Sequence, residues 1–217
     1  MSVVSTEEIR GHFPALQRTH AGYPVGYFDG PGGTQVPTEV IEAFTDYLLR
    51  HNANTDWKYP SSIETDQFLK EARVTFADFL KCSEREIVFG NNMTTLTYHL
   101  SRTLGKLWGP GDEIIVTQLD HQANQAPWHS LEEEYGVTVH TVPMLAENGK
   151  LDWDTLTELF TRRTRLLAIG GASNALGTVN DLDQAARLCR SFGAYFFVDA
   201  VHMASHMLMY VVKTDCD

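Results

Sequence analysis

The second half of the chain alternates short apolar runs with longer segments whose apolar residues recur at helical spacing. The apolar runs predict strands at residues 87–89, 114–116, 137–142, 166–169 and 195–199. The segments between them predict helices at residues 94–104, 124–135, 152–160 and 182–192. Strands that alternate with helices are typical of an α/β fold with a parallel sheet and right-handed crossovers.

The first 86 residues follow weaker patterns, in which helical stretches are separated by polar loops. Helices are predicted at residues 6–13 and 37–51. We expect the second of these to bury Val40, Phe44 and Leu48, because these residues share one helical face.

A longer helix is predicted to end near Leu80. Ser61 and Glu64 have the spacing of a capping box at its start. Its apolar stripe is typical of a helix that faces a core. The stripe consists of Phe68, Leu69, Ala72, Phe76, Phe79 and Leu80.

The composition narrows the possible partners. The 217 residues carry a formal net charge of −11, which argues against nucleic acid or an anionic membrane surface as the main partner. No window is apolar over the length of a membrane span, and no signal peptide is recognised. The three cysteines lack CxxC spacing and favour a reducing compartment, so we expect a cytoplasmic protein.

The run Tyr195–Val198 leads directly into Asp199, and His202 follows within one helical turn. Ligands of open α/β sheets bind beyond the carboxyl ends of such strands. A buried carboxylate there needs a cationic or N–H partner. A protonated pyridine nitrogen, a metal ion and the start of the next helix all remain open as that partner.

Polar residues also follow the other predicted strands. Thr94 and Thr95 open a helix, where hydroxyl and free N–H groups suit a phosphate, although threonine is also an ordinary helix cap. His121 can stack on a flat ring or take a proton, or it can be a surface histidine. Asn174 can donate its amide to an oxygen anion or form an Asx-turn. These residues point to a single ligand site at one edge of the sheet.

Two loops in the first half also have the composition of functional segments. The glycine-rich stretch 30–34 implies positive φ or close approach of the backbone to another group. It does not fit a dinucleotide fingerprint, because Gln35 occupies the position of the third glycine. The stretch 51–60 is polar and aromatic, which is more typical of an ordered functional loop than of a linker.

Taken together, these short motifs resemble the class V aminotransferase family, and most closely its cysteine desulfurase-like members. The resemblance covers nearly the whole chain in the order that the family has. It implies a three-layer αβα large domain with a mainly parallel sheet, the pyridoxal-phosphate fold type I. The motifs lie at residues 27–34, 93–95, 120–124 with 127–128, 173–178 and 198–202.

The resemblance implies an enzyme that uses pyridoxal 5'-phosphate and acts on an amino acid through an aldimine. By this similarity, Thr94 and Thr95 would hold the cofactor phosphate. His121 would stack on the ring and take part in proton transfer. Asp199 would pair with the ring nitrogen and keep it protonated.

Further roles follow from the same resemblance. Asn174 and His202 would bond the phenolic oxygen of the ring. Gly32 and Gly33 would lie near the substrate carboxylate. The loop that holds Asn54 would reach the site of a partner subunit, since sites of this family lie at a homodimer interface.

The chain departs from the family in its last residues. The family's Schiff-base lysine follows a further strand, and Lys213 lacks that context, so we do not assign it the role. We therefore expect a fragment, with residues 1–30 belonging to a small domain and residues 31–217 to an incomplete large domain. In the family's sheet, strands that follow residue 217 lie beside the strand at residues 87–89. We therefore expect this strand to have unpaired edges in the present chain.

Other functions remain possible. One is a metal-dependent hydrolase that uses Asp199, His202 and His206, because the two histidines have i, i+4 spacing. No glutamate base accompanies the pair. The other is a non-catalytic fragment or fold relative that only binds or dimerises.

Overall fold

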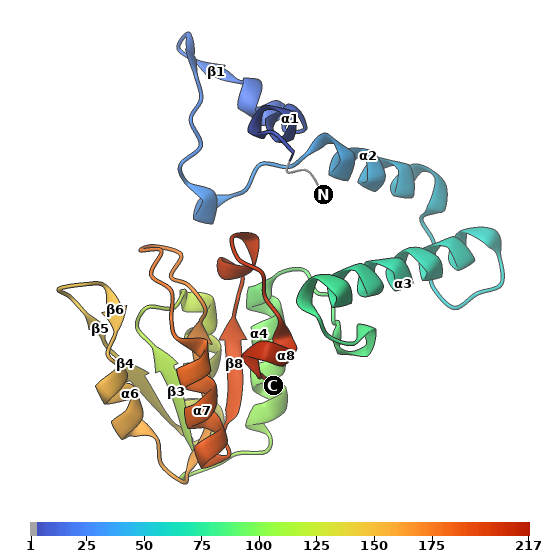
Figure 1. Ribbon diagram of the computed structural model, residues 1–217. Coiled ribbons are helices and arrows are strands. Elements are labelled where there is room, and N and C mark those ends of the chain that lie inside the picture. The colour runs from blue at the N-terminus through green and yellow to red at the C-terminus, as the bar shows by residue number, and fades with distance from the viewer. Residues whose placement is uncertain (1–3) are drawn as a thin grey trace. The chain divides into compact units, whose positions relative to one another are not determined.

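A computed structural model describes residues 4–217 (Figure 1). The chain divides into two compact units, one ending at Ala72 and the other formed by Arg73–Asp217. We call them unit 1 and unit 2 and describe each by itself. None of the helices in residues 4–217 is both long and apolar enough to cross a membrane.

Unit 2 is built on a four-stranded parallel sheet with the strand order β4-β3-β7-β8. Its strands are β3 Glu113–Thr117, β4 Thr138–Val142, β7 Thr164–Gly170 and β8 Tyr195–Asp199. Its helices are α4 Met93–Gly105, α5 Ala126–Tyr135, α6 Trp153–Leu159, α7 Leu182–Phe192 and α8 Val211–Thr214. A small antiparallel hairpin of β5 Met144–Leu145 and β6 Lys150–Leu151 leads into α6, and no sequence pattern predicted it.

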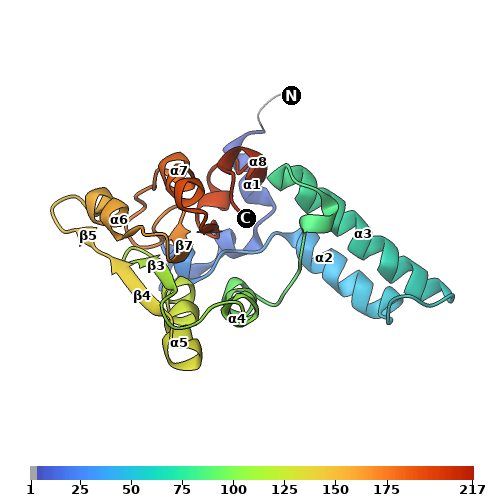
Figure 2. The same cartoon turned by 90° about the horizontal axis from the view of Figure 1, so that it is seen from below.

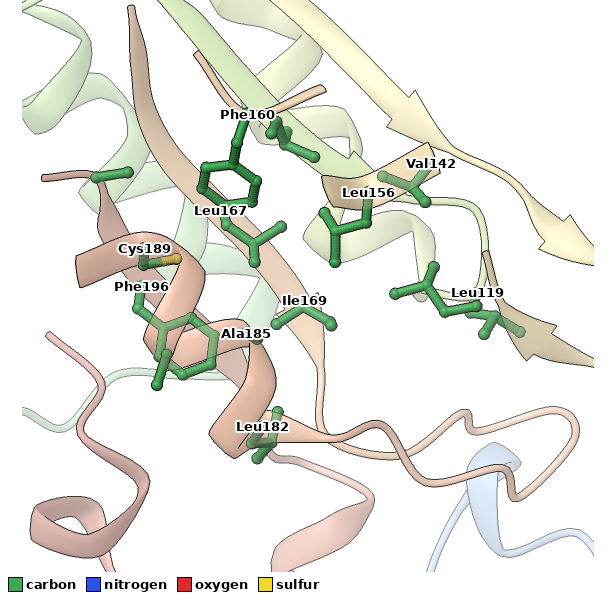
Figure 3. Packing of buried hydrophobic residues seen from close by; sticks show 14 of the residues in the cluster. Leu119, Val142, Leu156, Phe160, Leu167, Ile169, Leu182, Ala185, Cys189 and Phe196 are labelled. Atoms are coloured by element: carbon green, nitrogen blue, oxygen red, sulfur yellow. The ribbon is translucent and has the colours of Figure 1, made fainter. Parts of the chain in front are cut away.

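The sheet separates two apolar cores, because alternate residues of each strand point to opposite faces. Along β7, Leu167 and Ile169 join the core under α6 and α7, where Phe196 and Cys189 also lie (Figure 3). Leu166 and Ala168 join the other core, with residues of α5 and α4. Figure 2 shows α4 and α5 on one side of the sheet and α6 and α7 on the other. The predicted three-layer αβα fold is confirmed.

The helices begin and end where their sequences supply caps. The carboxylate of Asp152 accepts the N–H of Thr155 at the start of α6, and that of Asp181 accepts the N–H of Gln184 at the start of α7. Gly136 and Gly193 end α5 and α7 in the left-handed conformation, with φ of 73° and 70°. These local signals explain why the predicted bounds are close to the observed ones.

The strand predicted at residues 87–89 is wrong for the described chain. A 3-10 turn, η4 Glu84–Glu86, carries a capping box from Ser83, and the residues after it pair with no strand in residues 4–217. Val88 is 73% exposed and Phe89 is 42% exposed. Residues with strand propensity form a strand only when a neighbouring strand is present to pair with them.

Unit 1 contains short elements and the start of one long helix. They are α1 Thr6–Gly11, η1 Pro14–Gln17, the hairpin β1 Thr19–His20 with β2 Tyr23–Pro24, η2 Gly30–Gly32, α2 Thr38–Asp46, η3 Tyr47–His51 and α3 Pro60–Leu80. Pro37 precedes α2 at the N-cap position, without a side-chain hydrogen bond, and the chain continues from α2 into a π-helical turn, η3. Together they cover the helix predicted at residues 37–51.

Two predictions for unit 1 are wrong. Val40, Phe44 and Leu48 are 52%, 63% and 49% exposed, so α2 does not bury its apolar face within the described chain. The capping box of Ser61 and Glu64 does not form, because α3 already begins at Pro60 and Glu64 bonds the ring of His51 instead.

The apolar stripe of α3 is also less buried than expected. Phe68 is 44% exposed, Leu69 is 37% exposed and Phe76 is 49% exposed. A stripe at helical spacing predicts the helix correctly, but burial also requires another surface that covers the stripe.

Candidate active site at the carboxyl edge of the sheet

The predicted site residues of unit 2 follow three neighbouring strands. β3 is followed by His121, β7 by Asn174, and β8 ends at Asp199. These strands are parallel and adjacent, so their carboxyl ends share one edge of the sheet (Figure 1). Gly170 and Asp199 are register partners, and Asp199 O accepts the N–H of Gly171 at 2.8 Å. The edge therefore brings these loops together.

The start of α4 lies at the same edge. A short connection joins the end of α4 to the amino end of β3, so the helix runs back along the sheet and its first turn faces the carboxyl ends (Figure 1). Asn92 Oδ1 caps the helix by accepting the N–H and the hydroxyl of Thr95, at 2.9 and 3.0 Å. Since Asn92 is the cap, Thr94 is free of that role and is exposed. The first N–H groups of a helix favour an anion.

His121 is the N-cap of a 3-10 turn, η5 Gln122–Asn124. Its Nδ1 accepts the N–H of Ala123 at 3.1 Å, which fixes the ring against its own loop. The neutral ring therefore carries its proton on Nε2. The side chain is exposed at the edge, so one ring face is available to a flat ligand.

Asn174 lies in a turn that another residue stabilises. Ser173 Oγ accepts the N–H groups of Ala175 and Leu176 at 3.4 and 3.3 Å, and the turn is closed by a bridge between Ala172 and Val179. The Asn174 amide makes no hydrogen bond within residues 4–217, so the alternative of an Asx-turn at Asn174 is not observed. Its donor remains free for a ligand.

Asp199 uses one carboxylate oxygen locally. Its Oδ1 accepts the N–H of Val201 at 3.0 Å, while Oδ2 has no hydrogen-bond partner among the described residues. The side chain is half-buried, and within residues 4–217 no lysine, arginine or histidine forms an ion pair with it. An anion in this position favours a cationic ligand.

His202 and His206 flank a 3-10 turn, η6 Met203–Ser205, rather than sharing an α-helix face. Their rings still meet edge to face, with centroids 5.0 Å apart. In the described part of the chain no group of three or more His, Cys, Asp or Glu side chains could hold a metal ion. The hydrolase alternative with Asp199 is therefore without a metal-binding set.

Asp120, the residue before His121, is not among the predicted site residues but lies at the same edge of the sheet. Thr117 Oγ1 donates to its Oδ2 at 2.8 Å, and its Oδ1 lies against Gly170 at the end of β7. Burial raises the pKa of Asp120 to about 7, and the nearby carboxylate of Asp199 adds to the effect. No local pattern marks the carboxyl group of this half-buried residue as desolvated, because the contact with Gly170 comes from β7, later in the chain.

Two buried polar atoms near the site lack partners. Asn124 Oδ1 accepts the indole N–H of Trp128 at 3.4 Å, but Asn124 Nδ2 has no acceptor in hydrogen-bonding geometry. Thr178 Oγ1 is also unsatisfied among the described residues. Buried polar atoms without partners are uncommon, and near a ligand site they fit a polar ligand or ordered water. With the anion, the free amide and the helix start, these groups match an aromatic, cationic and phosphorylated cofactor.

The remaining predicted residues belong to unit 1. Gly32 ends the 3-10 turn η2, Gly33 follows it with a φ of 157°, and both are exposed. Asn54 is exposed in the loop between η3 and α3. Their predicted roles near the substrate stay predictions, as do the cofactor contacts assigned to the residues of unit 2.

The family model for class-V aminotransferases matches residues 26–217. The chain belongs to this family. A cysteine desulfurase of Dickeya dadantii is 31% identical over 97% of this chain, and one of Salmonella dublin is 34% identical over 97%. The chain spans about half the length of these relatives, 52% in both cases.

Solved structures support the same family. The apo cysteine desulfurase of Thermococcus onnurineus NA1 has a TM-score of 0.90 and 28% identity, and covers 100% of this chain and 52% of its own. The S-sulfonic acid form of an Escherichia coli cysteine desulfurase has a TM-score of 0.85 and 29% identity, covering 100% and 53%. The resemblance to this family is confirmed.

Proposed function

We propose that unit 2 binds pyridoxal 5'-phosphate at the carboxyl edge of its sheet, as part of a cysteine desulfurase-like enzyme that acts on an amino acid. The observation that carries the proposal is the uncompensated carboxylate of Asp199, which ends β8 beside the loops of His121 and Asn174. Family membership supports the same cofactor, and one solved relative with a TM-score of 0.79 is described with glycine covalently linked to it.

Each residue then has a role set by its own chemistry. The exposed hydroxyl of Thr94 and the first N–H groups of α4 would hold the phosphate. Thr95 would join them by exchanging its hydrogen bonds to Asn92 Oδ1 for bonds to the phosphate. Asp199 pairs with the ring nitrogen and keeps a proton there. When bound, the cofactor withdraws electrons from the Cα of the substrate, which is the chemistry that the protonated ring supplies.

The remaining site residues orient the ring. The ring of His121 is held in place by the N–H of Ala123 and would stack on the cofactor ring. The free amide of Asn174 and the ring of His202 donate to the phenolic oxygen. The desulfurase relatives favour removal of a group from the amino acid over transamination.

The three cysteines are poor candidates for a sulfur-accepting nucleophile. Burial raises the pKa of Cys189 to about 12 and also raises the pKa values of Cys82 and Cys216. The thiolate is the reactive form, so these thiols are little ionised at neutral pH. All three are unpaired, which supports the proposal of a cytoplasmic location.

We also propose that the cofactor forms no covalent link with Lys213. This residue is exposed on α8 and lines a hollow of about 510 Å³ together with Asp181 and Asp183. No strand lies between β8 and α8 in the described chain, so Lys213 lacks the preceding strand that the family's Schiff-base lysine has. Borohydride reduction followed by peptide mass mapping tests this, and an adduct on Lys213 would refute it.

Cofactor binding is tested by visible circular dichroism of the 217-residue chain during titration with pyridoxal 5'-phosphate. We expect an induced signal in the wild type and at least a tenfold weaker affinity in Asp199→Asn, because the ring nitrogen loses its anion. The matched control is Glu158→Gln, which removes one exposed carboxylate from α6. Equal affinities in Asp199→Asn and the wild type would contradict the proposal.

We further propose that the chain associates with a second copy. Large apolar side chains are exposed along α2, where Phe44 is 63% and Leu49 in the following turn 77% exposed. Exposed apolar surface of this kind is typical of an interaction site. Analytical ultracentrifugation should give a dimer for the wild type and a monomer for Phe44→Glu, whereas a monomeric wild type would refute this part.

A further inference from the structure

Asp120 carries a carboxyl group at the carboxyl edge of the sheet and forms no ion pair within the described residues. It lies after β3, where Thr117 Oγ1 donates to Oδ2 at 2.8 Å. Its Oδ1 lies so close to Gly170 of β7 that a Cβ added to this glycine would be 2.3 Å from the oxygen. Gln125 Nε2 donates to the backbone O of Asp120 at 2.6 Å and fixes the loop.

Asp199 ends β8, the strand that pairs with β7. Gly170 lies between the two acids, because it contacts Asp120 on one side and is the register partner of Asp199 on the other. Asp199 is the charged group that acts on Asp120, whereas the groups of β3, η5 and β7 that bond or face it are neutral, namely Thr117, Asn124 and Gly170. A second negative charge nearby disfavours ionisation of a carboxyl group that is already desolvated, as Asp120 is.

We propose that Asp120 and Asp199 form a coupled carboxyl pair, in which Asp120 holds a proton while Asp199 has no cation and releases it when a cationic ring binds. In that step the O–H bond of Asp120 breaks, the proton passes to solvent water, and Asp120 becomes a carboxylate. Asp120 is thus a positioning residue, because its neutral form leaves a single negative charge on Asp199. The ring-binding part rests on the proposed function.

The pair has a measurable consequence for cofactor affinity. Binding that releases a proton becomes stronger as pH rises, by up to about tenfold per pH unit below the pKa of the acid. Burial raises the pKa of Asp120 to about 7, so the increase should flatten above that pH. The variant Asp120→Asn keeps a neutral side chain and should lose this part of the pH dependence.

The first test needs no cofactor. Carbon-13 NMR of the aspartate carboxyl groups in the 217-residue chain, with Asp120→Asn used for assignment, should show Asp120 titrating near pH 7. In Asp199→Asn its titration should move to lower pH, because the like charge is gone. A wild-type Asp120 that titrates near 4, or that is unchanged by Asp199→Asn, would overturn the coupled pair.

The second test follows the binding of pyridoxal 5'-phosphate between pH 6 and pH 8 by circular dichroism. The cofactor's own ionisations act equally on all variants, so the slopes are compared. We expect a steeper slope for the wild type and Glu158→Gln than for Asp120→Asn, and equal slopes would overturn the release of a proton. If the wild type binds at no pH, the proposed function fails, and the carboxyl titration still decides on the pair.

Discussion

Gly170→Ala should destabilise unit 2 through its contact with Asp120. The new Cβ would lie 2.3 Å from Asp120 Oδ1, so the carboxyl group must retreat by roughly 1 Å to reach an ordinary contact. Overpacking of this kind costs about 1–3 kcal/mol, and loosening the hydrogen bond from Thr117 adds about 1 kcal/mol. The lower chain entropy of alanine offsets about 0.5 kcal/mol. We expect a net loss of about 1.5–3.5 kcal/mol.

The assay is guanidinium unfolding followed by circular dichroism and by tryptophan fluorescence, since Trp128 is fully buried in unit 2. Gly109→Ala is the matched control, because the nearest atom to its Cβ would be 3.9 Å away, and it should change the free energy of unfolding by less than about 0.5 kcal/mol. In the Asp120→Ala background Gly170→Ala should cost less than about 1 kcal/mol, because the clashing oxygen is gone. An equal cost in both backgrounds would refute the reasoning.

Three further predictions follow from other contacts. Leu167→Ala, at a fully buried position of the core in Figure 3, should cost about 2–5 kcal/mol in unfolding experiments, and a loss below about 1 kcal/mol would contradict the packing. The ring of His51 bonds Glu64 and Asp46, and the bond to Glu64 is the main cause that raises the pKa of His51. The contribution of His51 to the stability of unit 1 is therefore complete below about pH 6.5 and is lost as pH rises through the raised pKa. Hydrogen exchange of α2 and α3 should therefore show that His51→Gln loses protection at pH 6 but little at pH 9, and an equal loss at both values would argue against an ionic role. Iodoacetamide should label the native thiols at neutral pH far more slowly than the unfolded ones, and fast native labelling of Cys189 would contradict its burial.

The sheet of unit 2 could be predicted because its local signals and its tertiary contacts agree. Leu166–Ile169 is apolar on both faces, and the structure buries alternate residues in two different cores. The caps at Asp152 and Asp181 fix the starts of the following helices. Here, each local preference is satisfied by a neighbour within the same unit.

The predictions for residues 87–89 and for the apolar faces of α2 and α3 failed for one physical reason. In each case the sequence pattern predicts a surface that needs a partner, and the described residues do not cover it. Val88 has strand propensity, but its backbone has no strand beside it. Phe44 lies on an amphipathic helix face, but this face is exposed. The pattern determines the type of element, and the partner determines its burial.

The site divides along the same line. That His121, Asn174 and Asp199 lie at one edge of the sheet could be predicted from sequence, because each follows an apolar run and parallel strands bring such positions to one edge. Asp120 could not be found in this way, although it is the neighbour of His121. Its ionisation depends on two residues that come much later in the chain. Gly170, 50 residues later, has no side chain, so the Asp120 carboxyl group can lie against β7. Asp199, at the end of β8, adds a like charge. A glycine that ends a buried strand directly opposite a polar loop is therefore the signal to look for. There, a missing Cβ allows a carboxyl group to approach the next strand, and two acids can share one charge.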